Sequence, residues 1–398
     1  MLRKRSIRCL LAVASVSIFG CSAAPVPSDG TGATPPADVH TASGQGITTE
    51  LQLRHGMDAA WMRLAHWTDI FAIEGATSAA DAPAARARMM DATRAVAETI
   101  APAAGTEASN ELRVLMFARS GDIVAWVEAE RSGDTLVAEK ATTALDRNAS
   151  DLAAFFETLG VASGGGAGLE STLRQVTQAT QALVTAQMAG DWQGVVDAAS
   201  GSHKVMSNVA TRVENAMIAK LATSIVPMTT GDSMQEGLAS NLDEAAFWTR
   251  MTAIDGAGVL PRANDAQAGL GFYLGGFYGA SFQSQAVTLL HQVAADAYAY
   301  VSAVATGEPS GVATARAQWD ADVAQLTQSL AAQNTSWSDA ELRALAQADA
   351  VNAQAQIDAR HGGQWPADAQ AYDASLASSW AFAAALGKGL AEQFPKGI

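Results

Sequence analysis

The stretch FWTRMTAIDG at residues 247–256 repeats a pattern from much earlier in the chain, where residues 66–75 read HWTDIFAIEG. Both stretches place Trp-Thr, then Ala-Ile, then an acidic residue and Gly at the same spacing. Such self-similarity is the mark of a duplicated structural unit. The sequence therefore predicts two related units in tandem, and the rest of the chain can be tested against that prediction.

The clearest helical pattern covers residues 192–221, and its apolar seam returns over 365–390. Spacings of four and three alternate along both seams, as expected for helices that bury one face against other helices. The first seam consists of Trp192, Val196, Ala199, His203, Met206, Ala210, Val213 and Met217, and the second of Trp365, Ala369, Tyr372, Leu376, Ser379, Ala383, Leu386 and Leu390.

The middle of the repeat has a similar offset, since Gly105 and Gly133 each have a counterpart in the second copy, at Gly279 and Gly307. The opening pair, Trp67 and Trp248, is spaced more widely than these glycine pairs. We expect a local insertion of about seven residues near 258–265 to account for the difference.

The composition favours an all-α fold, because Ala is abundant and runs of β-branched residues are scarce. Short turns between the helices predict two tandem antiparallel bundles of about six helices each. The predicted helices are 50–75, 84–103, 107–132, 134–158, 168–189 and 192–221, then 240–257, 264–280, 281–306, 310–332, 338–360 and 366–393. The predicted segments are a signal peptide at 1–20, a disordered tether at 21–48, bundles at 49–223 and 239–398, and a linker at 224–238.

The N-terminus has the features of an export signal. A basic start is followed by an apolar run, Leu10 to Phe19, that is too short to span a bilayer. It ends in Ile18-Phe19-Gly20-Cys21, which resembles the lipobox of bacterial lipoprotein precursors. The resemblance implies lipidation at Cys21 and a protein anchored in the cell envelope. Because Ser22 rather than Asp follows, it also implies the periplasmic face of the outer membrane if the cell is Gram-negative.

Charge narrows the choice of partners. Removal of the signal, with its four basic residues, leaves 21 Lys and Arg against 40 Asp and Glu, a formal net charge of −19. So acidic a surface argues against binding nucleic acid or anionic lipid. We therefore expect the membrane attachment to be made by the lipid on Cys21 alone.

The body resembles an uncharacterised family of bacterial helical-bundle proteins, in which an acid-His pair lies three residues before Trp-Thr-Arg. The residues that carry the resemblance are Trp248-Thr249-Arg250, Leu342-Arg343, Gly190-Asp191-Trp192, Tyr372-Asp373 and Gln393-Phe394-Pro395. The chain departs from the pattern where the family has His, with Leu64 in one copy and Ala245 in the other. His203 is the one family His position that is kept here.

The histidines and acids suggest fragments of a metal site. Asp58 follows His55, and Asp69 follows His66, each at a spacing of three that places both side chains on one helix face. Three or four ligands make a metal site, so each pair alone predicts a mixed polar face. His203 lies on the apolar seam, where a neutral, hydrogen-bonded histidine is expected and no second histidine is in evident register. The candidate ligand or metal residues are Asp58, His66, Asp69 and His203.

Aromatic residues predict core packing more than binding. The stretch GLGFYLGGFYGASF at 269–282 sets Gly271, Gly275 and Gly279 four apart, which makes a smooth groove for another helix. Its aromatic residues at 272–278 would form a contact surface, for which we favour internal packing over a ligand. The nine tryptophans are spread over both copies, as core anchors would be.

No catalytic signature such as GxSxG, HExxH or a phosphate-binding P-loop is present. The sequence thus favours a non-enzymatic binding or scaffolding module of the envelope, with no cofactor. Its contact would be the groove between the bundles or the aromatic surface at 272–278, and its partner an envelope protein or a small ligand. The alternative is a metal-binding or metal-dependent helical bundle. A third possibility is a store for a hydrophobic ligand lined by tryptophans and methionines.

Overall fold

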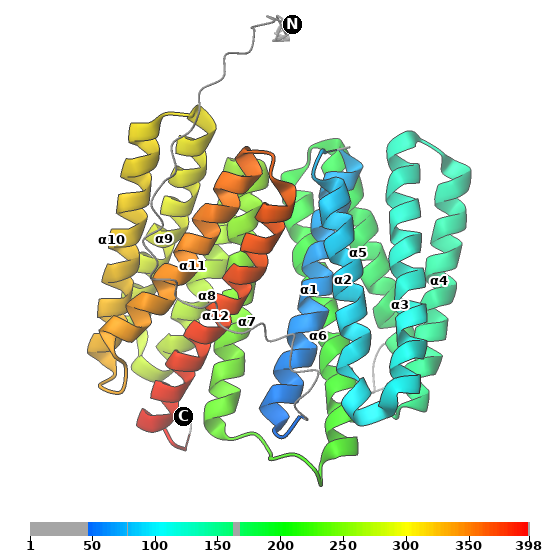
Figure 1. Cartoon of the computed structure of the whole chain (residues 1–398), viewed down its shortest axis with the longest axis horizontal. Coiled ribbons are helices and arrows are strands. Elements are labelled where there is room, and N and C mark those ends of the chain that lie inside the picture. Colours follow the sequence, from blue (N-terminus) through cyan, green and yellow to red (C-terminus); the bar gives the residue numbers. More distant parts are fainter. Residues whose placement is uncertain (1–46, 78, 162–167, 397–398) are drawn as a thin grey trace, which may run out of the picture. The chain divides into compact units, whose positions relative to one another are not determined.

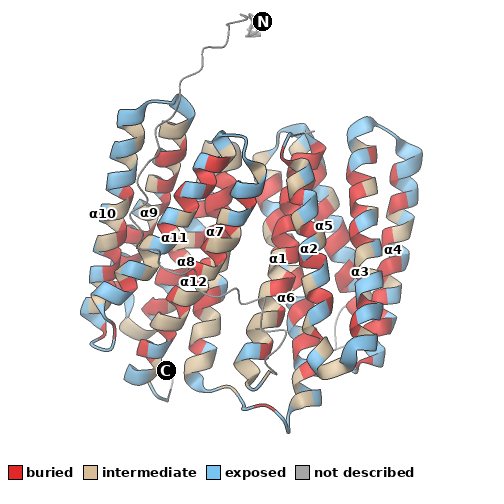
Figure 2. Ribbon diagram, viewed as in Figure 1, coloured by how far each residue is buried: buried red, intermediate tan, exposed pale blue. Residues whose placement is uncertain are grey.

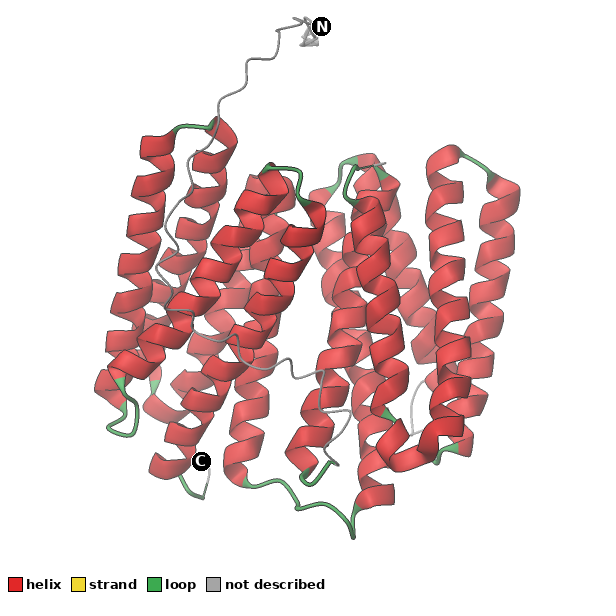
Figure 3. Ribbon diagram, viewed as in Figure 1, coloured by secondary structure: helices red, strands yellow, loops and turns green. Residues whose placement is uncertain are grey.

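The structure is a computed structural model that describes residues 47–77, 79–161 and 168–396. Cys21, the predicted export signal and nearly all of the predicted tether lie outside these ranges. Within them the chain forms twelve α-helices and a short 3-10 turn, with no strand (Figure 3). The predicted all-α class is therefore confirmed.

Six helices belong to each copy, and consecutive helices pack side by side (Figure 1). In each copy the first and last helices also pack together, which closes the unit. The first copy contains α1 (Glu50–Ala76), α2 (Ala82–Thr99), α3 (Ala101–Ser132), α4 (Thr135–Thr158), α5 (Leu169–Ala189) and α6 (Trp192–Leu221). The second contains α7 (Thr230–Asp255), α8 (Leu260–Tyr278), α9 (Ala280–Thr306), α10 (Pro309–Gln333), α11 (Asp339–His361) and α12 (Trp365–Gln393).

Helix α7 begins at Thr230, well before the expected start near 240, so much of the predicted linker is helical. The reason is a capping box: the Thr229 hydroxyl accepts from the Asp232 backbone N–H, and the Asp232 carboxylate accepts from the Thr229 N–H. The first helix of the other copy starts in the same way at Thr49 and Gln52. The segment 224–237 had the polar composition of a loop partly because the residues that cap α7, Thr229 and Asp232, are themselves polar.

Backbone geometry supports the duplication. The counterparts Gly105 and Gly279 have φ values of 89° and 84°, a region that residues with a Cβ rarely enter. Gly279 separates α8 from α9, and Gly105 kinks α3 close to its start. The difference in spacing arises elsewhere than expected, because the first copy is the longer one between its Trp67 and Gly105. No insertion occurs near 258–265, where α8 simply begins at Leu260.

Both apolar seams face inward as predicted, since every seam position is buried except the half-buried Trp192 and Trp365 (Figure 2). One core cluster continues from the first copy into the second, through Phe247 and Trp248 of α7 and Tyr372 of α12. The two bundles therefore share part of one hydrophobic core. That shared core brings α1, α6, α7 and α12 together.

The aromatic stretch at 272–278 is mostly internal, in line with the interpretation we favoured. Tyr273, Phe277 and Tyr278 pack against the core of the second copy, and Phe272 alone is 55% exposed. A Cβ on Gly271 would lie 2.8 Å from Val287, so this glycine allows α8 and α9 to approach closely. None of the described helices has an apolar segment long enough to cross a membrane.

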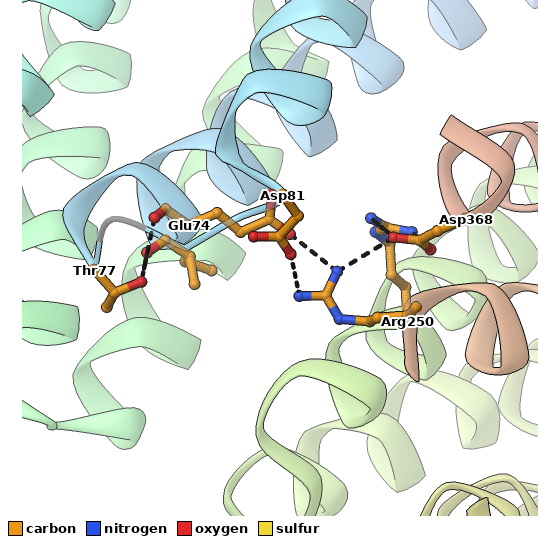
Figure 4. A network of polar contacts seen from close by, with 7 residues as sticks. Glu74, Thr77, Asp81, Arg250 and Asp368 are labelled. Carbon is orange, nitrogen blue, oxygen red and sulfur yellow. Dashed lines mark hydrogen bonds and ion pairs between the residues drawn. The ribbon is translucent and has the colours of Figure 1, made fainter. Parts of the chain in front are cut away.

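A buried network of charges joins the two copies (Figure 4). Arg250 of α7 donates to both carboxylate oxygens of Asp368 at the start of α12, over 2.5 and 3.0 Å. Arg360 of α11 donates to Asp368, to Glu74 of α1 and to Asp81 just before α2. Figure 4 shows Glu74 and Asp81 facing Arg250 and Asp368 across the junction.

The charges of this network balance when Glu74 carries a proton. Glu74 is 2% exposed, and burial together with the nearby Asp81 raises its pKa to about 8, although Arg250 and Arg360 oppose the shift. At neutral pH two arginines then face the two carboxylates of Asp81 and Asp368. The Arg250 guanidinium also lies over the rings of Trp67 and Tyr372, which adds cation–π contacts from both copies.

Removing one partner of a fully buried ion pair should destabilise the protein strongly. We expect Arg250→Met to lower the free energy of unfolding by about 3–5 kcal/mol, because Asp368 stays buried without its bidentate partner. The double variant Arg250→Met/Asp368→Leu should lose less than the sum of the two single changes. Urea unfolding followed by circular dichroism measures both. Arg94→Ala, which breaks an exposed pair with Asp91, serves as the control and should cost under about 1 kcal/mol.

The pKa of Glu74 makes stability depend on pH. Folding raises the pKa of this carboxyl from 4.5 to about 8, so the folded state holds an extra proton between these values and loses stability as pH rises through them. Glu74→Gln cannot titrate. We expect this variant to match the wild type near pH 5 and to unfold at a higher temperature near pH 9. An equal gap between the two proteins at both pH values would contradict the expectation, and Glu128→Gln at an exposed site is the control.

Candidate functional site

A cavity of about 370 Å³ lies between the two bundles, enclosed by α1 and α6 of the first copy and α7 and α8 of the second. Its wall is mainly polar and charged. The lining residues are Asp58, Met62, Ser200, His203, Lys204, Ser207, Ser240, Asn241, Asp243, Glu244, Arg262, Asp265, Ala266 and Gly269.

Three carboxyl groups of the wall are not engaged by other side chains. No hydrogen bond or ion pair joins Asp58, Asp243 or Asp265 to another residue of the described ranges. Burial raises the pKa of Asp58 to about 6. Burial, and then repulsion from Asp58, raises the pKa of Asp243 to about 7, against the attraction of Arg63. Both carboxyls therefore take up a proton more readily than an exposed aspartate does, and a bound cation would favour their charged form.

The positive side chains of the wall are largely paired already. Arg262 donates to Glu244 and, over 3.2 Å, to Ser200, and its guanidinium lies over Trp248. His203 contacts the same Glu244 through Nδ1 at 2.9 Å. Lys204 is exposed at the edge. The carboxyls of Asp58, Asp243 and the exposed Asp265 outnumber the amine of Lys204, so the charge that is left without an ion-pair partner among the described residues of the wall is on balance negative.

Behind the cavity wall, His203 lies against a second histidine. The ring centroids of His203 and His66 are 4.7 Å apart, and Phe247 packs against both rings. His66 Nδ1 is 2.9 Å from the Tyr372 hydroxyl. His203 Nε2 is 3.3 Å from Asp69, within ion-pair range although not aligned as a hydrogen bond. His66, Asp69 and His203 are at most 4% exposed.

These histidines differ in protonation. Burial lowers the pKa of His203, but Glu244 and Asp69 outweigh it and raise that pKa to about 9. Burial, followed by the positive charge of His203, holds the pKa of His66 well below its usual range. Burial raises the pKa of Glu244, but the positive charge of His203 and its hydrogen bond lower it by more, so the pKa of Glu244 is well below its usual range. A neutral His66 therefore faces a charged His203–Glu244 pair.

The side chains that could hold a metal ion are His66, His203 and Glu244, because one ligand atom from each lies within 4.8 Å of the other two. His66 Nε2 is buried and has no hydrogen-bond partner, which is rare for a polar atom in a protein interior. Imidazole and carboxylate are the ligands that zinc and related metals accept.

All four candidate residues from the sequence lie at this junction. His66, Asp69 and His203 come together behind the cavity, and Asp58 lines its wall. Asp69 does not form the expected pair with His66 of its own helix. It contacts His203 of α6 instead, at 3.3 Å. His55 stacks on Trp380 instead of joining Asp58.

Two expectations for His203 were wrong. It has a histidine neighbour, His66, and it is charged instead of neutral, because two carboxylates contact it. Sequence reasoning also missed Glu244, Arg262 and Tyr372, which come from the second copy. A signal for Glu244 existed: it occupies the acid position of the acid-His pair that precedes Trp-Thr-Arg in the resembling family.

Comparisons of the chain with protein-family models, with curated proteins and with solved structures give no match. The function must therefore be argued from the geometry of the site itself.

Glu244 should control the protonation of His203. We expect Glu244→Gln, which removes the largest favourable charge, to lower the pKa of His203 from about 9 towards or below its usual value. NMR titration of the imidazole signals of chelator-treated protein measures it. A histidine whose pKa is higher in the folded than in the unfolded protein stabilises the fold at pH values below its pKa in the unfolded protein. That stabilisation is lost as pH rises through its pKa in the folded protein. The wild type should therefore lose more stability than the variant between about pH 6.5 and 9. An unchanged pKa in the variant would show that Asp69 alone holds the proton.

Proposed function

We propose that this protein is a binding protein of the bacterial cell envelope, anchored by lipid at Cys21, that holds a small positively charged molecule in the cavity between its bundles. The observation that carries the proposal is the cavity of about 370 Å³ in whose wall the unpaired carboxyls of Asp58, Asp243 and Asp265 outnumber the amine of Lys204. The anchor and the envelope location rest on the N-terminal sequence.

The chemistry of the wall favours an amine. A carboxyl group without another partner gains from an ammonium or guanidinium group that donates hydrogen bonds to it, and such a group would also favour the charged form of Asp58 and Asp243. The hydroxyl groups of Ser207 and Ser240 also line the cavity and suit a polar ligand. At roughly 30 Å³ for each water molecule, the volume is that of about a dozen waters, enough for a short diamine or an amino sugar.

A hydrophobic ligand store finds less support. Trp61, Trp67 and Trp248 are at most 2% exposed and pack in the core. An apolar void beside Trp61 measures only about 10 Å³, too small for any organic ligand. The aromatic stretch at 272–278 is mostly packed inside the second copy, which also weakens it as a docking surface.

A diamine should bind and its uncharged analogue should not. We expect 1,4-diaminobutane to bind in calorimetric titration. At a concentration ten times its dissociation constant it should stabilise the folded protein by about 1.4 kcal/mol, which is measured as a higher melting temperature. Asp58→Asn and Asp243→Asn should each weaken binding about ten-fold, because each removes a charge-assisted hydrogen bond. Binding should also weaken as pH falls through about 6, where Asp58 takes up a proton.

The controls separate this cavity from general attraction to an acidic protein. Asp151→Asn removes an exposed acid on α4 and should leave binding unchanged. 1,4-Butanediol has the same length without charge and should not bind. Equal binding of diol and diamine, or full binding by the Asp58→Asn/Asp243→Asn double variant, would refute the proposal.

A further inference from the structure

His66 and Glu244 each have an outer partner that is hydrogen-bonded to one polar atom, His203 has Asp69 within ion-pair range of Nε2, and one ligand atom of each of the three residues lies within 4.8 Å of the other two. For His66 the partner is Tyr372, whose hydroxyl lies 2.9 Å from Nδ1. The other ring nitrogen, Nε2, is buried and unpartnered. A buried nitrogen without a partner costs free energy in the folded protein unless something fills that position.

For His203 the outer partner is Asp69. Its Oδ2 lies 3.3 Å from His203 Nε2, and its Oδ1 accepts from the Ser202 hydroxyl over 3.3 Å. An acid that holds one ring nitrogen fixes the orientation of the ring, as carboxylates do behind metal-bound histidines. His203 Nδ1 is then the nitrogen that faces Glu244.

For Glu244 the outer partners are Trp248 and Arg262, which both donate to Oε1. Oε2 is left to contact His203 Nδ1 at 2.9 Å. Three side chains from three helices, α1, α6 and α7, thus each direct one ligand atom to a common point. Such convergence, with outer partners behind the ligands, is what a metal site requires. An ion pair between His203 and Glu244 that served only to stabilise the fold would not require His66 beside it.

We propose that a divalent transition metal of the zinc class binds here, held by His66 Nε2, His203 Nδ1 and Glu244 Oε2. In the metal-free protein a proton shared by His203 Nδ1 and Glu244 Oε2 occupies part of the same space. Binding the ion releases that proton to solvent, and no oxidation or reduction is involved.

The geometry requires a small closure. Ligand atoms around a tetrahedral zinc ion at bonds of about 2.1 Å lie roughly 3.4 Å apart, whereas the three residues here each offer one ligand atom within 4.8 Å of the other two. The side chain of Glu244 is 22% exposed, so it is the least buried of the three ligands, and the closure would shift it together with its partners Trp248 and Arg262. Three protein ligands leave the fourth position open, and the cavity lined by His203 and Glu244 is the side from which a small molecule would reach it.

The repeat predicts the stoichiometry. The positions equivalent to His66, His203 and Glu244 in the other copy hold Phe247, Leu376 and Arg63. None of these three can bind a metal in place of its counterpart. We therefore expect one metal ion per chain.

The test is a titration of the full chain after chelator treatment. Zn²⁺ in competition with a chromophoric chelator should bind with one equivalent, and Co²⁺ should give the visible spectrum of a tetrahedral site. His66→Phe, which copies the residue at the equivalent position, and Glu244→Gln should each weaken binding on the order of 100-fold or more. Tyr372→Phe removes an outer partner and should weaken binding about 10- to 100-fold.

His361→Ala changes an exposed histidine and should bind as the wild type does. Thermal unfolding by circular dichroism shows whether each variant is folded, and Glu244→Gln remains decisive if His66→Phe is not. Absence of metal binding in the wild type, or undiminished binding in Glu244→Gln and His66→Phe, would overturn the proposal. Diamine binding should persist in His66→Phe, since His66 does not line the cavity, so the two proposals can fail separately.

Discussion

The junction of the two bundles rests on a buried charge network, in which Arg360 connects the bidentate pair of Arg250 and Asp368 in the second copy to the acids of the first copy. Both side chains of the bidentate pair are at most 2% exposed, so neither ion could remain there without the other. The pair sets α7 against α12, and Arg360 extends it to Glu74 and Asp81 of the first copy. Because these contacts fix α1 beside α7, they also determine that His66 and Glu244 come from opposite copies into one site.

Duplication alone would not have produced this junction. Where two equivalent helices face each other, identical charges would meet and repel, so the copies must differ at the interface. They do: Arg63, His66 and Asp69 of α1 correspond to Glu244, Phe247 and Arg250 of α7. The opposite signs allow one charged network to bridge the copies. The same divergence explains why the junction holds a single His-rich centre instead of two.

The sequence predicted the fold well because the fold depends on local patterns. The seams containing His203 and Tyr372 set the last helix of each copy, and the Trp67 and Trp248 motifs set the repeat. The candidate site was only half predicted, because His66 and His203 meet through the packing of the first and last helices of one copy, which periodicity does not specify. The wrong expectation of a neutral His203 has the same origin, since its charge depends on Glu244 from the other copy.

The cavity and the histidine centre are physically linked through Glu244 and His203, which belong to both. A cation in the cavity and a metal at the centre would each draw on the negative charge of Glu244, so each should weaken the other to the same extent. Arg262 limits this competition, because it already neutralises one carboxylate oxygen and leaves the other for the centre. The unpaired charge of Asp58 and Asp243 then remains for the cavity ligand. If both proposals hold, the arrangement would divide the carboxylates of one junction between two kinds of cation.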